Sequence, residues 1–373
     1  MPESFCGAGP SIRHGTMLDT DGKLQRKTLH CVRRLALGKK GQPSPMGWAQ
    51  MMQMFEDFRV RFNRTYQTQE ETQWRFKVFV QNLDRSRALQ ATELGTAQYG
   101  VTRFSDLTEN EFAETFALTS PSGPGLVLAG RWSRPGLSRR HEHMVQSCDW
   151  RKAGAVTAVK YQGEECRSCW AFAAASNIEA LWNIHRHIPR NVSVQEIIDC
   201  AHEQEGCNGG YVWQGLLYVF NSSNRLYPYV GRNQKCQRHR GRQLTTIDGY
   251  EILPRDEKYI ASVVASQGPV TALLNLKALQ GYEKGIIWRP SQECSRDHLD
   301  HAVVIVGFDE VKSRRGSRTG PYWIIQNSWG EHWGEEGYFR LHRGTNCCGI
   351  AMYPVTAIMK DSKKGAPRPC PGI

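Results

Sequence analysis

The hydrophobic pattern of this chain changes along its length, and the change limits the folds that the chain can adopt. In the first third, apolar residues recur at helical spacing, as at Phe55, Phe58 and Phe62, which share one face. A second helical pattern covers residues 170–182. After Gly268, short apolar runs between glycines and charges predict strands at 269–274, 302–306, 322–325 and 338–341. Helices followed by strands favour an α+β fold with two subdomains.

A stretch rich in glycine, proline and arginine, residues 118–144, separates the early helical pattern from the rest. Such a composition predicts an exposed linker, and exposed linkers are preferred sites of proteolysis. Residues 1–45 show neither periodicity nor the roughly 7–15-residue apolar stretch of a secretory signal. We interpret them as a disordered or atypical start. No run reaches the ~18 apolar residues that a membrane span needs, so we expect no membrane span.

The composition excludes some classes of protein and leaves others open. The chain has 373 residues, with 48 Lys and Arg against 36 Asp and Glu, a formal net charge of +12. Charged residues make up 23% and hydrophobic residues 40%, which excludes global disorder. The basic residues form no single block, so a nucleic-acid partner is disfavoured. The 12 cysteines indicate either an oxidising compartment or a metal site.

Two cysteines, Cys166 and Cys169, directly precede the helical pattern that begins at Trp170. A thiol at a helix N-terminus lies at the positive end of the helix dipole, which favours the reactive thiolate. Cys169 is therefore a candidate nucleophile, with a structural disulfide or a buried thiol as the alternative. The pair would also suit a redox motif, or half of a zinc site whose second C-x2–4-C pair is missing.

A cysteine nucleophile needs a base, and the base needs a group that orients it. His301 stands at the entry to the apolar run 302–306, and Asn327 ends another predicted strand. The Asn327 amide can hold the imidazole by a hydrogen bond, which Trp329 can cover from water. Cys169, His301 and Asn327 form an ordered triple with the order and separation known for papain-type sites.

Five segments with compatible spacing follow one another: 148–152, 166–172, 207–210, 300–302 and 327–330. One such motif is weak evidence, but five in order are strong. Together they show that the chain resembles the papain-like cysteine proteases over roughly residues 48–355. This resemblance implies a papain-like α+β fold, with a helical half and a β-barrel-like half.

The segment before the linker resembles the helical inhibitory propeptide of the same family. The matching motifs are Glu71-x3-Arg75-x3-Phe79-x2-Asn82 and the run 100–106. The resemblance implies a division into an atypical N-terminus, an inhibitor-type propeptide, a linker with the activation region, a peptidase domain and a C-terminal tail. The bounds of these five parts are 1–45, 46–117, 118–144, 145–357 and 358–373.

The resemblance also assigns roles to single residues. Cys169 would attack the peptide carbonyl, His301 would act as acid and base, and Asn327 would orient the imidazole. The oxyanion would be held by the backbone N–H of Cys169 and the side-chain amide of Gln162. The substrate cleft would include Gly209, Gly210, Asp300 and Trp329.

Two features depart from the family pattern. Gln162 precedes Cys169 by seven residues where the family has six, and the extra residue lies near Glu164 and Glu165. If that residue bulges outward, Gln162 still reaches the oxyanion. Arg167 stands where the family has glycine and puts a bulky cation beside the cleft. We therefore expect weak turnover of generic small peptides.

The resemblance implies disulfide bonds, and disulfide bonds indicate the cellular compartment of the protein. The expected pairs are Cys166–Cys207, Cys200–Cys236 and Cys294–Cys348. A Cys148–Cys370 bridge is a further hypothesis, and Cys347 has no assigned partner. Disulfides favour the secretory pathway, either the lysosome or the lumen of the endoplasmic reticulum. Three glycosylation sequons, at Asn63, Asn191 and Asn221, point the same way.

We expect a monomer that needs no cofactor and no metal. Its expected partners are peptide or protein substrates, its own propeptide and cystatin-type inhibitors, with no nucleic acid among them. Three functions stay open. The favoured one is an active thiol endopeptidase stored as a zymogen. The others are a catalytically impaired papain-fold protein that acts by binding, and a basic protein that binds nucleic acid or an acidic partner.

Overall fold

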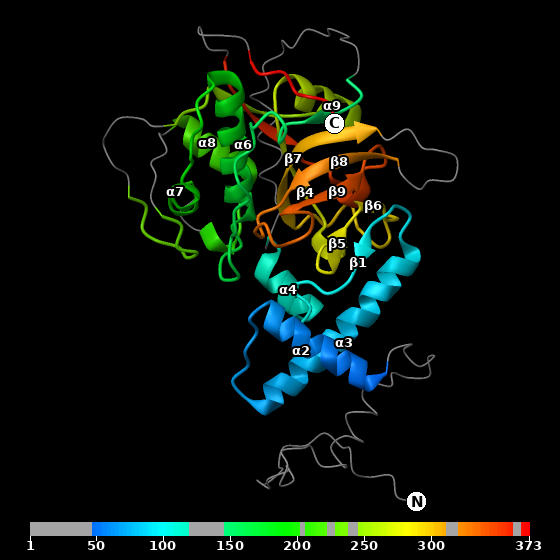
Figure 1. Cartoon of the computed structure of the whole chain (residues 1–373). Helices are drawn as coiled ribbons and strands as arrows, with labels where there is room; N and C mark the ends of the chain where they lie inside the picture. The colour runs from blue at the N-terminus through cyan, green and yellow to red at the C-terminus, as the bar shows by residue number, and fades with distance from the viewer. Residues whose placement is uncertain are drawn as a thin grey trace, which may run out of the picture. The chain divides into compact units, whose positions relative to one another are not determined.

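The structure is a computed structural model (Figure 1), and it describes residues 47–118, 145–201, 206–221, 228–237, 245–310, 320–360 and 367–373. The chain divides into two compact units between Val80 and Gln81.

The first unit is built on helix α2 (Trp48–Arg61) and the beginning of helix α3 (Gln69–Thr92). Phe55 and Phe58 are buried, and both rings lie within 5.4 Å of the Phe79 ring, measured between centroids. The expected helical face is confirmed for these residues, whereas Phe62 is the C-cap of α2 and only half-buried. Aromatic packing therefore joins the two helices.

The second unit begins with the rest of α3, strand β1 (Gln98–Tyr99) and helix α4 (Glu109–Phe116). A capping box starts α4, because the Thr108 hydroxyl accepts from Glu111 N while the Glu111 carboxylate accepts from Thr108 N. Strand β1 pairs antiparallel with β5 (Tyr282–Lys284). Residues 81–118 are thus bound into the second unit by backbone hydrogen bonds.

Three helices form one half of this unit: α6 (Cys169–Arg186), α7 (Val194–Cys200) and α8 (Val212–Asn221). Nearly every residue of α6 is buried, because other elements surround it. Figure 1 shows α6 between α8 and the strands. The short side chains of Ala171 and of residues 173–175 let neighbouring backbones approach α6 closely. The first turn of α6 is therefore fixed on several sides.

An eight-stranded sheet forms the other half, in the order β3-β10-β4-β7-β8-β9-β6, with β2 paired to β7. Its pairs are antiparallel except β6 with β9. The register of β7 and β8 shifts between Ile305 and Gly307, where a Cβ on Gly307 would lie 2.3 Å from the Cys148 carbonyl oxygen. The bounds are β2 Cys148–Asp149, β3 Gly249–Ile252, β4 Val270–Leu274, β6 Ile286–Ile287, β7 His301–Glu310, β8 Pro321–Gln326, β9 Tyr338–His342 and β10 Val355–Ile358.

The remaining elements of the described residues are helix α9 (Glu257–Ser266) and three short 3-10 turns: η2 (Gly206–Asn208), η3 (Leu276–Ala278) and η4 (Cys347–Gly349). Each of the four apolar runs expected to be strands lies largely within β4, β7, β8 or β9. The prediction of an α+β fold is therefore confirmed, and the early strands β2 and β3 are additions that the sequence pattern did not indicate.

Four disulfides join distant parts of the second unit: Cys148–Cys370, Cys166–Cys207, Cys200–Cys236 and Cys294–Cys348. The Cys148–Cys370 bridge brings the tail beside β2, where Asp149 N donates to the Pro371 carbonyl at 2.9 Å. Among the described cysteines, Cys169 and Cys347 are free, and both are buried.

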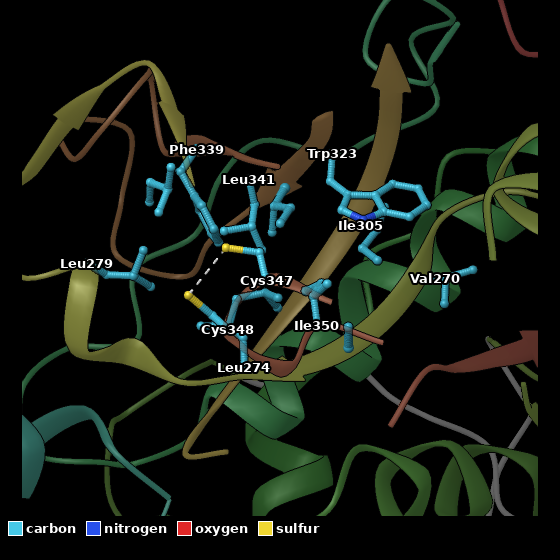
Figure 2. Packing of buried hydrophobic residues seen from close by; sticks show 14 of the residues in the cluster. Val270, Leu274, Leu279, Ile305, Trp323, Phe339, Leu341, Cys347, Cys348 and Ile350 are labelled. Atoms are coloured by element: carbon cyan, nitrogen blue, oxygen red, sulfur yellow. Dashed lines mark hydrogen bonds between the residues drawn. The ribbon is translucent and has the colours of Figure 1, made fainter. Parts of the chain in front are cut away.

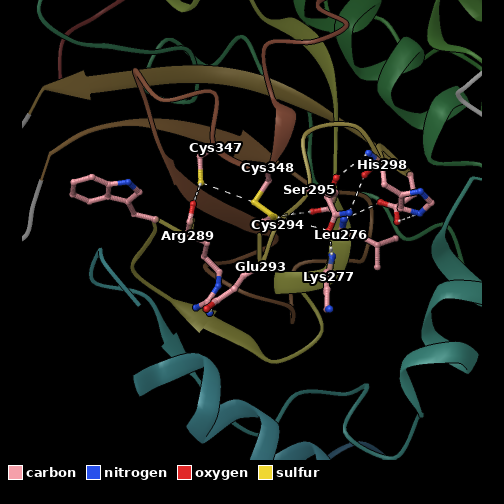
Figure 3. Close-up of a disulfide and its surroundings, with 12 residues drawn as sticks. Leu276, Lys277, Arg289, Glu293, Cys294, Ser295, His298, Cys347 and Cys348 are labelled. Atoms are coloured by element: carbon pink, nitrogen blue, oxygen red, sulfur yellow. Dashed lines mark hydrogen bonds and ion pairs between the residues drawn. A yellow bond between two sulfur atoms is a disulfide. The ribbon is translucent and has the colours of Figure 1, made fainter. Parts of the chain in front are cut away.

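Cys347 lies in η4 within the main hydrophobic core (Figure 2). Its Sγ is 4.0 Å from the Sγ of Cys348, whose own bond is to Cys294 (Figure 3). Leu279 and Phe339 are among the apolar side chains gathered around it. All of these neighbours belong to the segment that the sequence assigns to the peptidase domain.

Candidate active site

Cys169 is the first residue of α6, and its side chain is completely buried. The backbone N–H of Ala302 donates to its Sγ at 3.5 Å, so the thiol meets the start of strand β7. Burial raises the pKa of Cys169 to about 12, and the backbone N–H groups of Ala302 and Trp170 oppose that rise. Cys169 is therefore a neutral thiol while it is covered.

His301 opens β7 directly before Ala302, and it is also completely buried. Its Nε2 lies 2.8 Å from Asn327 Oδ1, which also accepts from Ser328 N at 2.8 Å. Because this Oδ1 accepts, the neutral imidazole carries its proton on Nε2, and Nδ1 is the nitrogen that can take a proton from a thiol. Burial lowers the pKa of His301 to about 4, while the hydrogen bond to Asn327 raises it by less.

The sheet explains how these residues meet. Asn327 directly follows β8, and Gln326 on that strand is paired with Val304 on β7, three residues after His301. The Trp329 ring lies 4.8 Å from the imidazole, measured between centroids, and is buried. The buried Trp329 ring therefore packs against the histidine of the histidine–asparagine pair. The contact of Ala302 with Cys169 places α6 against the same end of the sheet.

Gln162 is fully buried although the loop after it carries an extra residue. Its Nε2 donates to the Cys166 carbonyl at 3.3 Å, and its Oε1 accepts from the Ser328 hydroxyl at 2.7 Å. Glu165, in contrast, is exposed. The longer loop thus turns outward at Glu165 and leaves the Gln162 amide beside the segment that leads to Cys169.

The remaining predicted cleft residues lie at both sides of the thiol. Gly210 contacts the Trp170 ring so closely that a Cβ would lie 2.6 Å from it, which explains the glycine. Gly209 has φ +129°, a conformation that favours glycine. Asp300 is buried next to His301, where Oδ1 accepts from Leu276 N at 2.8 Å. Burial raises the pKa of Asp300 to about 6.

The site is covered by residues 104–118, which we call the covering segment. Three of its aromatic rings, those of Phe104, Phe112 and Phe116, have centroids 5.1–5.5 Å from Trp329. The backbone N–H of Leu118 donates to the Asp300 carbonyl at 2.7 Å, and Leu118 lies in the same apolar cluster as Cys169. Leu118 is 6% exposed, although the sequence-based division puts it at the start of the linker.

Arg167 also binds the covering segment. Its Nε donates to the Glu114 carbonyl at the last turn of α4. The cation that departs from the family pattern therefore has a partner in the covered site.

A second contact lies farther from Cys169. The Glu93 carboxylate accepts from Trp288 N at 2.7 Å and from Tyr99 Oη at 2.6 Å, and it pairs with the buried Arg289 guanidinium at 3.3 Å. This anchor holds the segment that leads to β1 against β6.

Two other classes of site are absent from the part of the chain that the structure describes. No group of three or more His, Cys, Asp or Glu side chains in it could hold a metal ion. None of its helices combines the length and the apolar character needed to cross a bilayer. Of the three sequons, Asn63 and Asn191 are exposed, and the side chain of Asn221 lies outside the described residues.

Sequence reasoning missed three residues of this site: Ser168, Tyr229 and Ser328. Ser168 and Ser328 lie inside the matching segments 166–172 and 327–330, and nothing in the local pattern around Tyr229 marks it. The structure brings Ser328 and Tyr229 to Gln162, since their hydroxyls each donate to an oxygen of that residue.

Comparison with known proteins gives two family matches. Residues 144–358 match the model of the papain family cysteine proteases, and residues 55–112 match the cathepsin propeptide inhibitor domain. Cathepsin W of Mus musculus is 38% identical over 358 residues, which cover 90% of this chain and 93% of that protein. Cathepsin F of Mus musculus is 38% identical over 324 residues, covering 85% and 67%.

Solved structures of proforms are also similar. Digestive procathepsin L 3 of the Tenebrio molitor larval midgut has a TM-score of 0.70 at 27% identity, covering 83% of this chain and 99% of that one. The recombinant stem bromelain precursor has a TM-score of 0.69 at 29% identity, covering 84% and 100%. Gln90 and the run 104–108 predict a likeness to cathepsins F and W. The run 147–150, the long insertion between His301 and Asn327 and the tail with Cys370 favour cathepsin W, and the comparisons confirm this likeness.

Proposed function

Because the chain belongs to the papain family of cysteine proteases and carries a cathepsin propeptide inhibitor domain, we propose that Cys169, His301 and Asn327 cleave the peptide bond. The protein is a cysteine peptidase made as a zymogen. The observation that best supports the three residues is one cluster of contacts. Ala302 N meets the Cys169 sulfur, and the preceding His301 is hydrogen-bonded to Asn327.

Catalysis proceeds through an acyl-enzyme. The Cys169 thiol gives its proton to His301 Nδ1, and the resulting thiolate attacks the carbonyl carbon of the scissile peptide bond. The imidazolium then protonates the leaving amine as the C–N bond breaks, which leaves a thioester on Cys169. Water, deprotonated by His301, hydrolyses the thioester and restores the thiol. Asn327 keeps the imidazole in the tautomer that this cycle needs.

The tetrahedral intermediate carries a negative oxygen that needs hydrogen-bond donors. The Cys169 backbone N–H and Gln162 Nε2 are the donors that we propose. Gln162 is supported in this role by its burial and by the two hydrogen bonds that hold its amide. Asp300, Trp329, Gly209 and Gly210 border the substrate, and Arg167 beside them slows the turnover of generic small peptides.

The covering segment keeps the proform inactive by excluding both water and substrate from the thiol. With the pKa of Cys169 near 12 and that of His301 near 4, both groups are neutral between these values. Loss of the cover rehydrates the site and lets the thiolate–imidazolium pair form.

The division of the chain and its location follow from the same proposal. Cleavage within residues 118–144 separates the propeptide, residues 46–117, from the peptidase domain, residues 145–357. Four disulfides and the exposed Asn63 and Asn191 support folding in the secretory pathway, with a lysosomal or endoplasmic-reticulum destination. The partners that we propose are protein substrates, the propeptide itself and cystatin-type inhibitors, bound by a monomer.

The proposed roles are tested by peptide hydrolysis after processing of the full chain. Cys169→Ala abolishes hydrolysis, and His301→Ala lowers kcat by about 10²–10⁴-fold through loss of acid–base catalysis. Cys347→Ala is the matched control, because it removes the other free, buried thiol of the described chain and leaves kcat unchanged. Hydrolysis that survives in Cys169→Ala, or that fails equally in Cys347→Ala, would refute the assignment.

A further inference from the structure

The hydroxyl of Tyr229 lies between the two segments that supply the oxyanion hole. It donates to the backbone carbonyl of Gln162 at 2.5 Å, and it lies 2.9 Å from the Ser168 hydroxyl. Gln162 carries one donor of the oxyanion hole, and Ser168 directly precedes the residue that supplies the other. One side-chain oxygen therefore touches both segments.

The direction of these hydrogen bonds follows from the atoms involved. A carbonyl oxygen can only accept, so the single phenolic proton of Tyr229 goes to Gln162. The Ser168 hydroxyl then has two acceptors for its single proton, the phenol oxygen at 2.9 Å and the Cys166 carbonyl at 3.3 Å, and the phenol oxygen is the nearer. Burial raises the pKa of Tyr229 above its usual value, although the hydrogen bond from Ser168 opposes the rise. The phenol therefore stays protonated and keeps both bonds throughout the neutral pH range.

The bond to Ser168 changes how α6 begins. Ser168 is the N-cap of this helix, a position where a serine hydroxyl commonly accepts from a first-turn N–H. Here no side-chain cap is made, and the Ser168 hydroxyl lies near the Tyr229 hydroxyl at 2.9 Å and the Cys166 carbonyl at 3.3 Å. The N–H groups of Cys169 and Trp170 consequently remain turned toward the thiol, where they oppose the rise of its pKa.

The bond to Gln162 fixes the other donor. The loop from Gln162 to Cys166 is one residue longer than in the family and turns outward at Glu165. The Gln162 side chain is held by Cys166 and Ser328, and Tyr229 holds its backbone carbonyl.

Tyr229 is itself fixed against α6. Its ring packs edge-on against Phe172, with centroids 5.0 Å apart and an angle of 73° between the planes. Phe172 lies within the first turn of α6, so the phenol is held to the same helix that begins with the nucleophile.

From these contacts we propose that Tyr229 is a positioning residue that sets the distance between the two oxyanion-hole donors, the Gln162 amide and the Cys169 N–H. The inference rests on the proposed function, because it needs Cys169 as the nucleophile. The two hydrogen bonds of the Tyr229 hydroxyl go to Gln162 and Ser168, and we expect it to act through them, although Cys169 is close enough to raise its pKa. It matters most in the transition state, where the oxyanion forms, and little in the binding of substrate.

The test is a double-mutant cycle on the processed enzyme, with Tyr229→Phe, Gln162→Ala and the two combined. Phenylalanine keeps the ring on Phe172 and removes only the hydroxyl. We expect Tyr229→Phe to lower kcat about tenfold with KM nearly unchanged, and Gln162→Ala to lower kcat by about 10²–10³-fold. When Gln162 is already alanine, Tyr229→Phe should lower kcat by less than about twofold, because the Tyr229 hydroxyl acts through the amide that is then missing.

Tyr218→Phe is the matched control. It removes a phenolic hydrogen bond of similar length, 2.9 Å to Glu196, from the same helical half of the unit, and its kcat should equal that of the unchanged enzyme. A peptide aldehyde, whose adduct with Cys169 carries the oxyanion, gives an independent readout. Tyr229→Phe should weaken this aldehyde about tenfold while leaving the rate of epoxide alkylation of Cys169 unchanged.

Two results would overturn the positioning role. One is an equal loss of kcat from Tyr229→Phe with and without Gln162, which means that the hydroxyl acts independently of the oxyanion hole. The other is a loss confined to KM or to the melting temperature. The proposed function fails by a different result, which is hydrolysis that survives Cys169→Ala, so the two failures are distinguishable.

Discussion

The two free thiols of the second unit, Cys169 and Cys347, are alike in burial and differ in what buries them. Burial raises the pKa of Cys169 to about 12 and that of Cys347 to about 11, so both are neutral thiols. Cys347 is enclosed by core residues such as Leu279 and Phe339 (Figure 2). Cys169 is enclosed partly by the covering segment, which apart from Leu118 falls within the propeptide that we propose.

The difference teaches that burial alone distinguishes neither a nucleophile nor an inert cysteine. Leu279 and Phe339 beside Cys347 lie outside the covering segment, whereas Cys169 loses part of its cover when that segment leaves. Cys169 also stands at a helix N-terminus beside a histidine, while Cys347 stands beside the Cys294–Cys348 disulfide (Figure 3). In the function that we propose, latency comes from the covering segment and reactivity from Cys169 and His301 beneath it.

The alkylation rates of the two thiols should differ most when the aromatic cover of Cys169 is weakened. Phe112→Ala in the full chain removes a buried ring from Trp329, and such substitutions cost about 3–5 kcal/mol. If only half of that cost falls on the closed state, opening becomes roughly 10- to 70-fold more frequent and alkylation of Cys169 accelerates accordingly. Alkylation of Cys347, measured by mass spectrometry in the same sample, should not change. Equal acceleration at both thiols would mean that the whole unit had loosened.

The pH dependence of the free energy of unfolding is a second test, because His301 and Asp300 lie under the same covering segment as Cys169. The folded state lowers the pKa of His301 from 6.5 to about 4, so acidification from 6.5 to 4 protonates the unfolded chain first and lowers the free energy of unfolding. Asp300 changes the free energy of unfolding in the opposite direction as pH falls. Its pKa is raised from 3.8 to about 6, so between these values the folded state binds the extra proton and gains stability.

Each of the two contributions amounts to about 3 kcal/mol across its range, and they oppose each other. We therefore expect Asp300→Asn to make the full chain lose more stability than the unchanged chain as pH falls from 6.5 to 4. His301→Gln should make it lose less. Denaturant unfolding at several pH values measures the free energy of unfolding of each variant. Identical pH profiles for the two variants would contradict the burial of these groups.

The smallest expected effect concerns Arg167. Its hydrogen bond to the Glu114 carbonyl is near the surface and contributes about 1 kcal/mol to closure. Arg167→Gly should accelerate alkylation of Cys169 in the full chain by about fivefold and leave Cys347 unaffected. In the processed enzyme the same change should raise the turnover of small peptides, because the side chain beside the cleft is gone. No change in either assay would contradict both effects proposed for Arg167, on closure of the covering segment and on turnover of small peptides.

Much of this arrangement can be predicted from the sequence, because local patterns carry it. The strand runs, the helix that begins at Cys169 and the α+β class follow from hydrophobic periodicity. Cys169, His301 and Asn327 stand out because each has a chemistry that its neighbours lack. The four disulfide pairs of the structure include the three that the family resemblance implies and the bridge from Cys148 to Cys370.

What the sequence did not reveal depends on contacts between distant residues. Leu118 lies in a stretch whose composition indicates a linker. Its N–H nevertheless donates to the Asp300 carbonyl, and its side chain packs in an apolar cluster. The partner of Arg167 is a backbone atom, which no sequence pattern can indicate. Tyr229 follows a proline in an unremarkable stretch, and only the fold brings its hydroxyl to Gln162. Side chains that act by holding backbone leave no motif of their own.

The central claim is that Cys169 is the nucleophile and that the covering segment makes it latent. It is tested most directly by labelling the chain with an epoxide-type inhibitor of thiol proteases before and after processing, and by mapping the modified peptide by mass spectrometry. The account predicts no label before processing, stoichiometric label on Cys169 afterwards, and none on Cys347 in either sample. Label on Cys169 in the intact proform, or a processed chain in which Cys169 stays unlabelled, would contradict it.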